Sequence, residues 1–518
     1  GGRRIQCLEA PFMILGEPSR TDGTAATLDD LFRRAGVRHP DAIALVDPPN
    51  RESFTAGAPR TLSFAQADRA ISVFAAKLRG FGLQTDSIVA IQLPNIVESI
   101  VAFLGVLRAG MIAAPMPLLW GHQDIVAALG QIDAKAIITC SRIGAVAYAE
   151  RARQAAVELF SIRHVCGFGP DLPDGVVPLD GVFGSGFADI PAAYTRPSPA
   201  ALHVAAITFG LEPRGITPIA RNHIELVAGG LEIYLAADIA ADTPQLSTIP
   251  IGSFAGVALT LLPWLLSGGT QHLHHGFDPD AFAAQCGALG NGRVMLPAAA
   301  VAPISDAGLL TSAKQTAVTL WRAPERMAGA RPWESPSVLV DVASFGEIGV
   351  LAAHRGANRL PAAIPYGAVD PSHRAAGAPV LIETTRGGAG TLALRGRMVP
   401  SFPQGAGCGH ALRLSANNAG YADTGFACRV DAPGLVVTAP PPGVTVIGGY
   451  PFHLNRVDEL IAEIDRNATI VALPDADLGQ RFAGRAVDRA DLLSKLTKQG
   501  VNPLISAAFQ PRGTSQAA

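Results

Sequence analysis

The stretch from Ile207 to Gly215, ITFGLEPRG, combines a hydroxyl, small residues and one cation, as a phosphate-binding loop does. Such a loop needs small residues so that successive backbone N–H groups can converge on anionic oxygens, with hydroxyls and a cation to share the charge. Thr208, Gly210 and Gly215 supply the hydroxyl and the glycines, and Arg214 offers a planar cation. Two bulky side chains and a proline without an N–H interrupt the pattern, so an ordinary link between a strand and a turn is the alternative interpretation.

The composition predicts a large, well-buried chain without a strong electrostatic field. Of its 518 residues, 48% are hydrophobic and 16% are charged, against roughly 25% charged in an average globular protein. The formal net charge of −2 offers nothing to a polyanion, and we expect no nucleic-acid partner. No apolar run reaches the roughly 18 residues of a membrane-spanning helix, and no secretory signal is recognisable. We therefore expect a cytoplasmic protein without a transmembrane segment.

Helices and strands alternate over the first two thirds of the chain. The segment TLDDLFRRAG (27–36) begins on a capping threonine and ends on a glycine, which predicts a helix, while 43–46, 87–93 and 111–116 have the pattern of strands. Alternation of this kind predicts parallel sheets with helices on both faces. We expect two α/β halves, at 27–199 and 200–343, with a buried helix over Phe254 to Leu266.

The pattern then changes to short strands between clusters of glycine and proline, from 344 to 431, which predicts a small barrel-like subdomain. The segment APGLVVTAPPPG (432–443) marks a boundary, because three consecutive prolines continue neither a helix nor a central strand. The expected fold class is α/β. We expect an N-terminal domain (1–431) of two doubly wound sheets and a small β-barrel-like subdomain, followed by a small α+β C-terminal domain (432–518) in which Asn455 caps a helix.

Three segments, in order, carry a resemblance to a known family: LPNIVESIVAFLGVLRAGMIAAPMP (93–117), STIPIGSFAGVALTLLPWLLSGGTQHLHHGFDPDAF (247–282) and ATIVALPDADLGQRFAG (468–484). They are similar to the AMP-forming acyl-CoA synthetases of the adenylate-forming superfamily. In that family a carboxylate attacks the α-phosphorus of ATP to give an acyl-adenylate and pyrophosphate, and a thiol, usually of CoA, then takes the acyl group. The resemblance implies a small-molecule carboxylic acid as substrate, with ATP, Mg²⁺ and CoA.

The resemblance also implies roles for individual residues. The stretch from Thr208 to Gly215 takes the place of the family's phosphate loop, with Arg214 as a catalytic cation where the family has a lysine. SFGEIG (344–349) resembles the segment that places a glutamate near Mg²⁺ and the triphosphate, so Glu347 is expected to be catalytic and a metal ligand. The expected nucleotide contacts in these two segments are Thr208, Gly210, Gly215, Phe345 and Gly346.

Two further segments complete the implied site. YADTG (421–425) resembles the segment that holds the ribose, but Phe426 follows where the family has an aspartate, so Asp423 and Thr424 become the expected contacts. In the region that resembles the acyl site, the expected substrate-binding residues are Ser253, Phe254, Gly256 and Leu259.

Departures from the family pattern leave two functions open. The chain has TAPPPG (438–443) where the family hinge carries Gly-Arg and Lys-Asp, and it lacks the Pro-x-Thr-x-x-Gly-Lys motif. The first function is that of an acyl-CoA synthetase-like ligase that activates a fatty or aromatic acid and passes it to CoA. The alternative is a catalytically degenerate, non-adenylating relative that binds an acyl group or acyl-CoA, or acts as a partner subunit. A homodimer is also left open.

Overall fold

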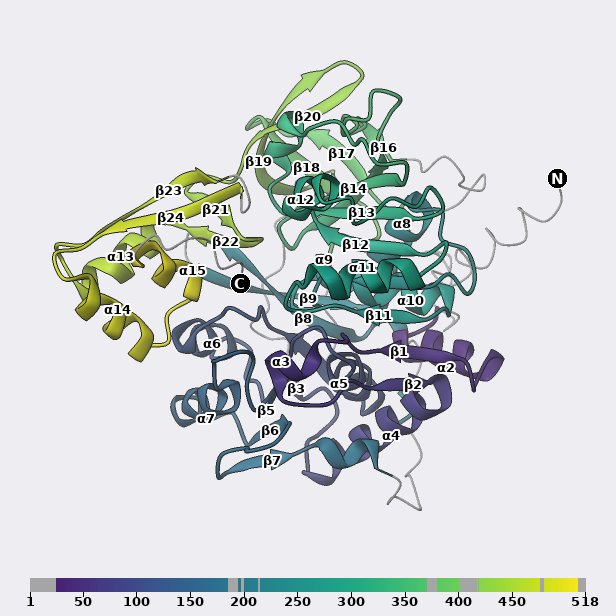
Figure 1. Cartoon of the computed structure of the whole chain (residues 1–518), viewed down its shortest axis with the longest axis vertical. Helices are drawn as coiled ribbons and strands as arrows, with labels where there is room; N and C mark the ends of the chain where they lie inside the picture. The colour runs from purple at the N-terminus through teal and green to yellow at the C-terminus, as the bar shows by residue number, and fades with distance from the viewer. Residues whose placement is uncertain are drawn as a thin grey trace.

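The computed structural model describes residues 25–184, 194–196, 200–212, 215–369, 380–400, 417, 419–475 and 479–510 (Figure 1). Two large sheets with their helices form the body of the molecule. A five-stranded sheet lies at one end of this body, and the C-terminal strands and helices lie to one side of it (Figure 1).

The first large sheet has seven strands in the order β7–β6–β5–β3–β4–β8–β9, all parallel except the β8–β9 hairpin. Along β3, Val89 and Ile91 face the core between the two sheets, whereas Ile88 and Ala90 face the core on the opposite side. Both faces of this strand are therefore buried, as is usual in a parallel sheet. The strands are β3 (Ile88–Ile91), β4 (Ile112–Pro115), β5 (Ala136–Cys140), β6 (His164–Phe168), β7 (Val176–Pro178), β8 (Val204–Glu212) and β9 (Gly215–Asn222).

The second large sheet has eight strands in the order β15–β14–β13–β12–β10–β11–β1–β2. Its six central strands are parallel, and an antiparallel strand closes each edge. The strands are β1 (Ile43–Val46), β2 (Thr61–Ser63), β10 (Gln245–Ser247), β11 (Gln271–Leu273), β12 (Arg293–Pro297), β13 (Thr316–Trp321), β14 (Val338–Phe345) and β15 (Gly349–His354).

Helices cover both faces of these sheets. One layer packs in the core between the sheets and consists of α2 (Leu28–Arg38), α4 (Phe64–Gly80), α5 (Val97–Arg108), α8 (His223–Ala236), α9 (Phe254–Gly256), a π-helical turn (Val257–Leu261) and α10 (Leu262–Ser267). The outer layers contain α6 (His122–Leu129), α7 (Tyr148–Glu158), α11 (Pro279–Ala288) and α12 (Val301–Asp306). A short α3 (Arg51–Thr55) follows β1. The expected α/β class with two doubly wound sheets is confirmed, as are the Thr27 cap and the buried helix from Phe254 onward.

The two large sheets exchange strands, which the expected halves 27–199 and 200–343 did not anticipate. The hairpin β8–β9 belongs to the sheet of the first half, and β1 and β2 belong to the sheet of the second. The apolar pattern of a strand shows that it is buried but not which neighbour it pairs with, so a boundary at 199/200 does not separate the sheets. Within the described residues, no helix is both long and apolar enough to cross a membrane.

The remaining strands are antiparallel. The five-stranded sheet β16 (Gly367–Ala368), β17 (Glu383–Arg386), β18 (Thr391–Arg395), β19 (Ala422–Asp431) and β20 (Gly434–Ala439) corresponds to the expected β-rich subdomain. Next come the hairpins β21 (Val444–Ile447) with β22 (Tyr450–His453) and β23 (Thr469–Asp475) with β24 (Gly479–Arg485). They pack with α13 (Leu454–Ile464), α14 (Arg489–Lys498) and α15 (Pro503–Ser506) around a separate apolar cluster.

The expected cap at Asn455 is wrong. Helix α13 begins at Leu454 directly after strand β22, and His453 occupies the capping position with an extended backbone and without a side-chain hydrogen bond. The Leu454 N–H instead donates to the carbonyl of Gly443 at 2.8 Å. The residue just before β21 therefore satisfies the first N–H of the helix, which would otherwise be left to a capping side chain or to solvent.

Candidate functional site

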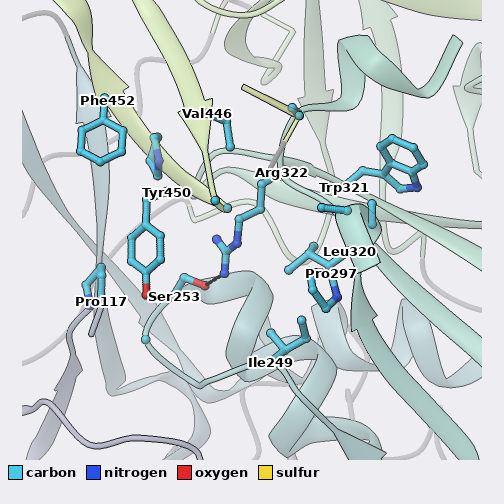
Figure 2. A pocket seen from close by; sticks show the side chains of 18 of the residues that line it. Pro117, Ile249, Ser253, Pro297, Leu320, Trp321, Arg322, Val446, Tyr450 and Phe452 are labelled. Atoms are coloured by element: carbon cyan, nitrogen blue, oxygen red, sulfur yellow. Dashed lines mark hydrogen bonds between the residues drawn. The ribbon is translucent and has the colours of Figure 1, made fainter. Parts of the chain in front are cut away.

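A cavity of about 1300 Å³ lies where three parts of the chain meet (Figure 2). One wall is the carboxyl edge of the eight-stranded sheet, where β10, β12, β13 and β14 end. The β8–β9 hairpin forms a second wall, and the β21–β22 hairpin forms a third. The carboxyl edge of a parallel sheet is where α/β proteins bind ligands. The labelled lining side chains in Figure 2 are mostly apolar: Pro117, Ile249, Pro297, Leu320, Trp321, Val446 and Phe452.

The β8–β9 hairpin holds much of the expected phosphate loop in extended form. Thr208 pairs with Ile219, and Gly210 pairs with Thr217. Because an extended strand directs successive N–H groups to opposite sides, those of residues 208–212 do not converge on one point as they do in a phosphate nest. Gly210 and Gly215 line the cavity. Arg214 lies outside the described residues, and its role stays a prediction.

Glu347 follows strand β14 and lines the cavity with 7% of its surface exposed. Its Oε2 accepts a hydrogen bond of 2.7 Å from the backbone N–H of Phe254. Burial raises the pKa of Glu347 above its ordinary value, while the charge of Arg221 and two hydrogen bonds oppose this shift. The structure thus places one of the expected catalytic residues at the cavity wall, with its carboxylate oriented by the backbone of α9.

Arg221, near the end of β9, is a buried cation beside Glu347, with 1% of its surface exposed. Its Nη2 donates to the backbone carbonyls of Glu347 and Ile348, and its Nη1 donates to Thr208 Oγ1 at 3.3 Å. The guanidinium carbon lies 3.8 Å from the centre of the Phe254 ring. Burial lowers the pKa of Arg221 to about 10, which leaves it charged at neutral pH. Arg221 therefore ties the phosphate-loop hairpin to the turn that carries Glu347.

Arg322 is the first residue after β13, and its side chain extends into the cavity between Tyr450 and Leu320 (Figure 2). Its Nη2 donates a hydrogen bond of 2.8 Å to the hydroxyl of Ser253. Tyr450 comes from the β21–β22 hairpin, and burial raises the pKa of its phenol, while the charge of Arg322 acts in the opposite direction. A cation, a hydroxyl and a phenol from three separate segments thus meet inside apolar walls.

The residues expected to bind the acyl group divide into two sets. Ser253 lines the cavity, and its hydroxyl also accepts a hydrogen bond of 3.1 Å from the N–H of Gly256. Phe254, Gly256 and Leu259 are not among the lining residues; they are buried in the core between the sheets or pack beside it. Their assignment to substrate binding stays a prediction, and the structure gives them packing contacts.

The residues expected at the ribose are not among those that line the cavity. Asp423 is exposed, and its carboxylate accepts a hydrogen bond of 2.9 Å from the N–H of Gly425. The hydroxyl of Thr424 donates to the carbonyl of Leu392 at 2.7 Å. The ring of Phe426 packs edge-on against Phe345, with 5.8 Å between ring centres.

Phe345 is fully buried, so its assignment to the nucleotide stays a prediction. Gly346 adopts a positive φ of 57° in the turn between β14 and β15, a conformation that favours glycine. Gly346 therefore lets the backbone turn sharply just before Glu347.

The cavity wall offers a carboxylate for a magnesium ion, but the described part of the phosphate loop forms no backbone cradle for a phosphate. Mg²⁺ is commonly held by one or two carboxylates together with substrate phosphates, and Glu347 offers one such carboxylate. No cluster of three or more His, Cys, Asp or Glu side chains within the described residues could hold a metal by itself. The described part of the phosphate loop is extended, and the expected ribose contacts lie elsewhere, so the fit to a nucleotide is incomplete.

Three residues of the site were not expected from the sequence: Arg221, Arg322 and Tyr450. A signal for Arg322 does exist, because it follows the apolar run TAVTLW at the point where a buried parallel strand ends. A charged residue there lies at the ligand-binding edge of the sheet. Arg221 contacts Glu347, and Tyr450 lies beside Arg322, although the members of each pair are far apart in the sequence. No local sequence pattern therefore predicts that they belong to the site.

Comparison with known proteins gives a consistent set of relatives. A family model described as AMP-binding enzyme matches residues 32–209. Salicyl-AMP ligase/salicyl-S-ArCP synthetase of Mycobacterium tuberculosis is 30% identical over 268 residues, or 50% of this chain and 44% of that protein. 4-Hydroxyphenylalkanoate adenylyltransferase of Mycobacterium marinum is 36% identical over 134 residues, or 25% and 21%. The matches span less than half the length of these two relatives.

Solved structures share the fold over nearly the whole chain. The amide bond synthetase McbA from Marinactinospora thermotolerans has a TM-score of 0.67 at 17% identity, covering 92% of this chain and 94% of its own. ATP-bound MatB from Rhodopseudomonas palustris has a TM-score of 0.60 at 17% identity, covering 92% of each chain. At this level of identity the likeness concerns the fold alone.

Proposed function

We propose that this chain, as a member of the superfamily of AMP-binding, adenylate-forming ligases, activates a carboxylic acid with ATP and passes the acyl group to CoA. The observation that carries the proposal is the cavity of about 1300 Å³, whose wall combines Glu347 with apolar side chains such as Ile249, Leu320 and Phe452. A volume of this size suits a fatty or aromatic acid.

In the proposed reaction the acid's carboxylate attacks the α-phosphorus of ATP, pyrophosphate leaves, and a thiol then replaces AMP at the acyl carbon. Glu347 would hold Mg²⁺, and Arg214 would contact the phosphates. Arg221 would act indirectly, because its hydrogen bonds to the carbonyls of Glu347 and Ile348 fix the turn from which the carboxylate projects. The apolar side chains around the cavity would hold the body of the acid and keep water away from it.

A second candidate function is favoured by the extended phosphate-loop hairpin. If residues 208–212 keep their pairing with β9, their own N–H groups form no phosphate nest. The chain would then bind an acyl group or acyl-CoA without forming an adenylate.

Pyrophosphate release separates the two functions. The full chain is incubated with ATP and Mg²⁺ and a panel of short, long and aromatic acids, and ATP binding is measured by calorimetry. The ligase proposal expects release that depends on the acid. Release no higher than without acid across the whole panel, together with no heat of ATP binding, contradicts it and leaves the binding function, which acid titration in the absence of ATP then tests.

A further inference from the structure

Arg322 stands out among the cations around the cavity because it is partly buried and no carboxylate pairs with it. Arg456 also lines the cavity without an ion pair among the described residues, but it is exposed. Arg326, Arg331 and Arg355 line the same cavity, and each lies within 4.0 Å of a carboxylate oxygen. Within the described residues, the guanidinium of Arg322 has no such ion pair. Its hydrogen-bond partner is the neutral hydroxyl of Ser253, at 2.8 Å.

A guanidinium has five N–H donors in a planar fork, and one of them is used by Ser253. Burial in the cavity wall lowers the pKa of Arg322, while the charges of Glu347 and Tyr450 act against this shift. Arg322 is partly buried, and an oxyanion placed against its unused donors would form two parallel, charge-assisted hydrogen bonds. The fork matches the two oxygens of a carboxylate or a phosphate.

The surroundings of Arg322 indicate what kind of molecule would bring the oxyanion. Ser253 lies below the guanidinium, and Tyr450 lies beside it (Figure 2). The neighbouring walls are apolar and come from Ile249, Pro297, Leu320, Trp321 and Phe452. A small inorganic anion would leave these walls in contact with water, whereas an anion with an apolar body would cover them.

We propose that Arg322, oriented by Ser253, is the residue that receives the oxyanion of an apolar ligand and thereby determines which acids enter the cavity. The assignment rests on the proposed function for the class of ligand, which is an apolar monocarboxylic acid, but the binding step requires no catalysis. A phosphate group of a nucleotide presents the same oxygen geometry and is the other source of such an oxyanion.

Calorimetry without ATP tests the assignment on the full chain. The probes are decanoate and 2-naphthoate, the uncharged amides of the same two acids, and AMP. We expect the acids to bind at least tenfold more tightly than their amides. We expect Arg322→Gln to weaken acid binding by about ten- to a hundredfold, as the loss of a charge-assisted hydrogen bond does. Arg322→Lys, which keeps the charge without the fork, should recover part of the affinity.

Arg331→Gln is the matched control, because Arg331 borders the same cavity with 77% of its side chain exposed. It should leave acid affinity within about twofold of that of the unaltered chain, because an exposed charge contributes little. The thermal unfolding midpoint of each variant shows whether the fold survives. Equal affinity for acids and amides, or unchanged acid affinity in folded Arg322→Gln, overturns the assignment, as does a chain that binds none of the probes.

The AMP arm identifies the source of the oxyanion. If Arg322→Gln weakens AMP and leaves the acids unchanged, the assignment to an acid is overturned in favour of a nucleotide phosphate. Acid binding that depends on Arg322 without any pyrophosphate release supports the assignment and removes the proposed ligase function. If Arg322→Gln releases pyrophosphate with the same KM for the acid as the unaltered chain, the proposed ligase function is supported and the assignment of Arg322 is overturned.

Discussion

At the scale of single residues, a backbone hydrogen bond orients the carboxylate of Glu347. The Phe254 N–H holds Oε2 at 2.7 Å, so glutamine at position 347 can keep this contact while the negative charge is lost. We expect Glu347→Gln to lower kcat/KM for acid-dependent pyrophosphate release by roughly tenfold or more, because in the proposed function this charge stabilises the transition state. The matched control is Glu334→Gln, an exposed carboxylate that borders the same cavity. Equal losses in both variants would contradict a specific role for Glu347.

The ionisation of Glu347 also predicts a pH dependence. An ordinary glutamate has a pKa of about 4.3, and burial raises the pKa of Glu347 above its ordinary value. The charged form that would bind Mg²⁺ is therefore lost at a higher pH than in an ordinary glutamate. As the pH falls through this raised pKa, kcat/KM should fall with it. Glu347→Gln should lack this acidic limb in its residual activity. A profile with the same limb in both proteins would assign the limb to another group.

At the scale of helices and strands, the sequence predicts which elements exist and are buried better than it predicts which strands pair with one another. Thr27 and Ser63 precede apolar patterns of helical period, and both cap the helices that follow them. Strand pairing is different, because β1 pairs with β11 across more than two hundred residues of sequence. Apolar periodicity contains no information on such a partner. Glu347 was expected because SFGEIG resembles a segment of the family, whereas Arg221 and Tyr450 lie in segments without such a resemblance.

The contact between α2 and α8 depends on an uncharged histidine. The N–H of Leu28 donates to Nδ1 of His223 at 3.2 Å, and burial lowers the pKa of His223 to about 3. The unfolded chain, with a histidine pKa near 6.5, binds the proton more readily, so stability is lost as the pH falls from about 6.5 towards 3. At pH 5 the loss should amount to about 2 kcal/mol in the free energy of unfolding.

Urea unfolding at pH 7.5 and pH 5 measures this loss, and His223→Gln should remove about 2 kcal/mol of it. Burial also lowers the pKa of His275, to about 4, so this second histidine keeps its own contribution to the pH dependence. The matched control is His39→Gln, a histidine exposed at the end of α2. If His223→Gln and the unaltered chain lose the same free energy between the two pH values, the ring is not the titrating group.

At the scale of the whole molecule, the cavity exists because the C-terminal strands lie against the large sheets. Tyr450 and Phe452 of the β21–β22 hairpin form part of its wall, and β22 contacts β8. The guanidinium of Arg326 donates to the carbonyl of Val446 at 3.1 Å across the same junction. The division at 431/432 into two domains, which the prolines of TAPPPG suggest, stays a prediction. If the C-terminal part were to change its orientation between the two steps of the proposed reaction, it would have to break this junction.

A close backbone contact at the start of α6 offers a test of that junction. The N–H of His122 donates to the carbonyl of Gly500 at 3.2 Å, and a Cβ added to Gly121 would lie 1.7 Å from the same oxygen. The φ of Gly121 is −82°, which alanine also adopts, so Gly121→Ala should act through this clash alone.

We expect Gly121→Ala to displace the C-terminal part and to speed amide hydrogen exchange across residues 443–453 and 496–505 by roughly tenfold, since overpacking costs about 1–3 kcal/mol. Acid affinity should fall with it, because Tyr450 and Phe452 would leave the cavity wall. The matched control is Gly80→Ala at the end of α4, where an added Cβ meets nothing within 4 Å. Unchanged exchange in Gly121→Ala would show that the junction opens readily without the substitution. In that event the stiffness of the three prolines would not prevent the C-terminal part from reorienting between two half-reactions.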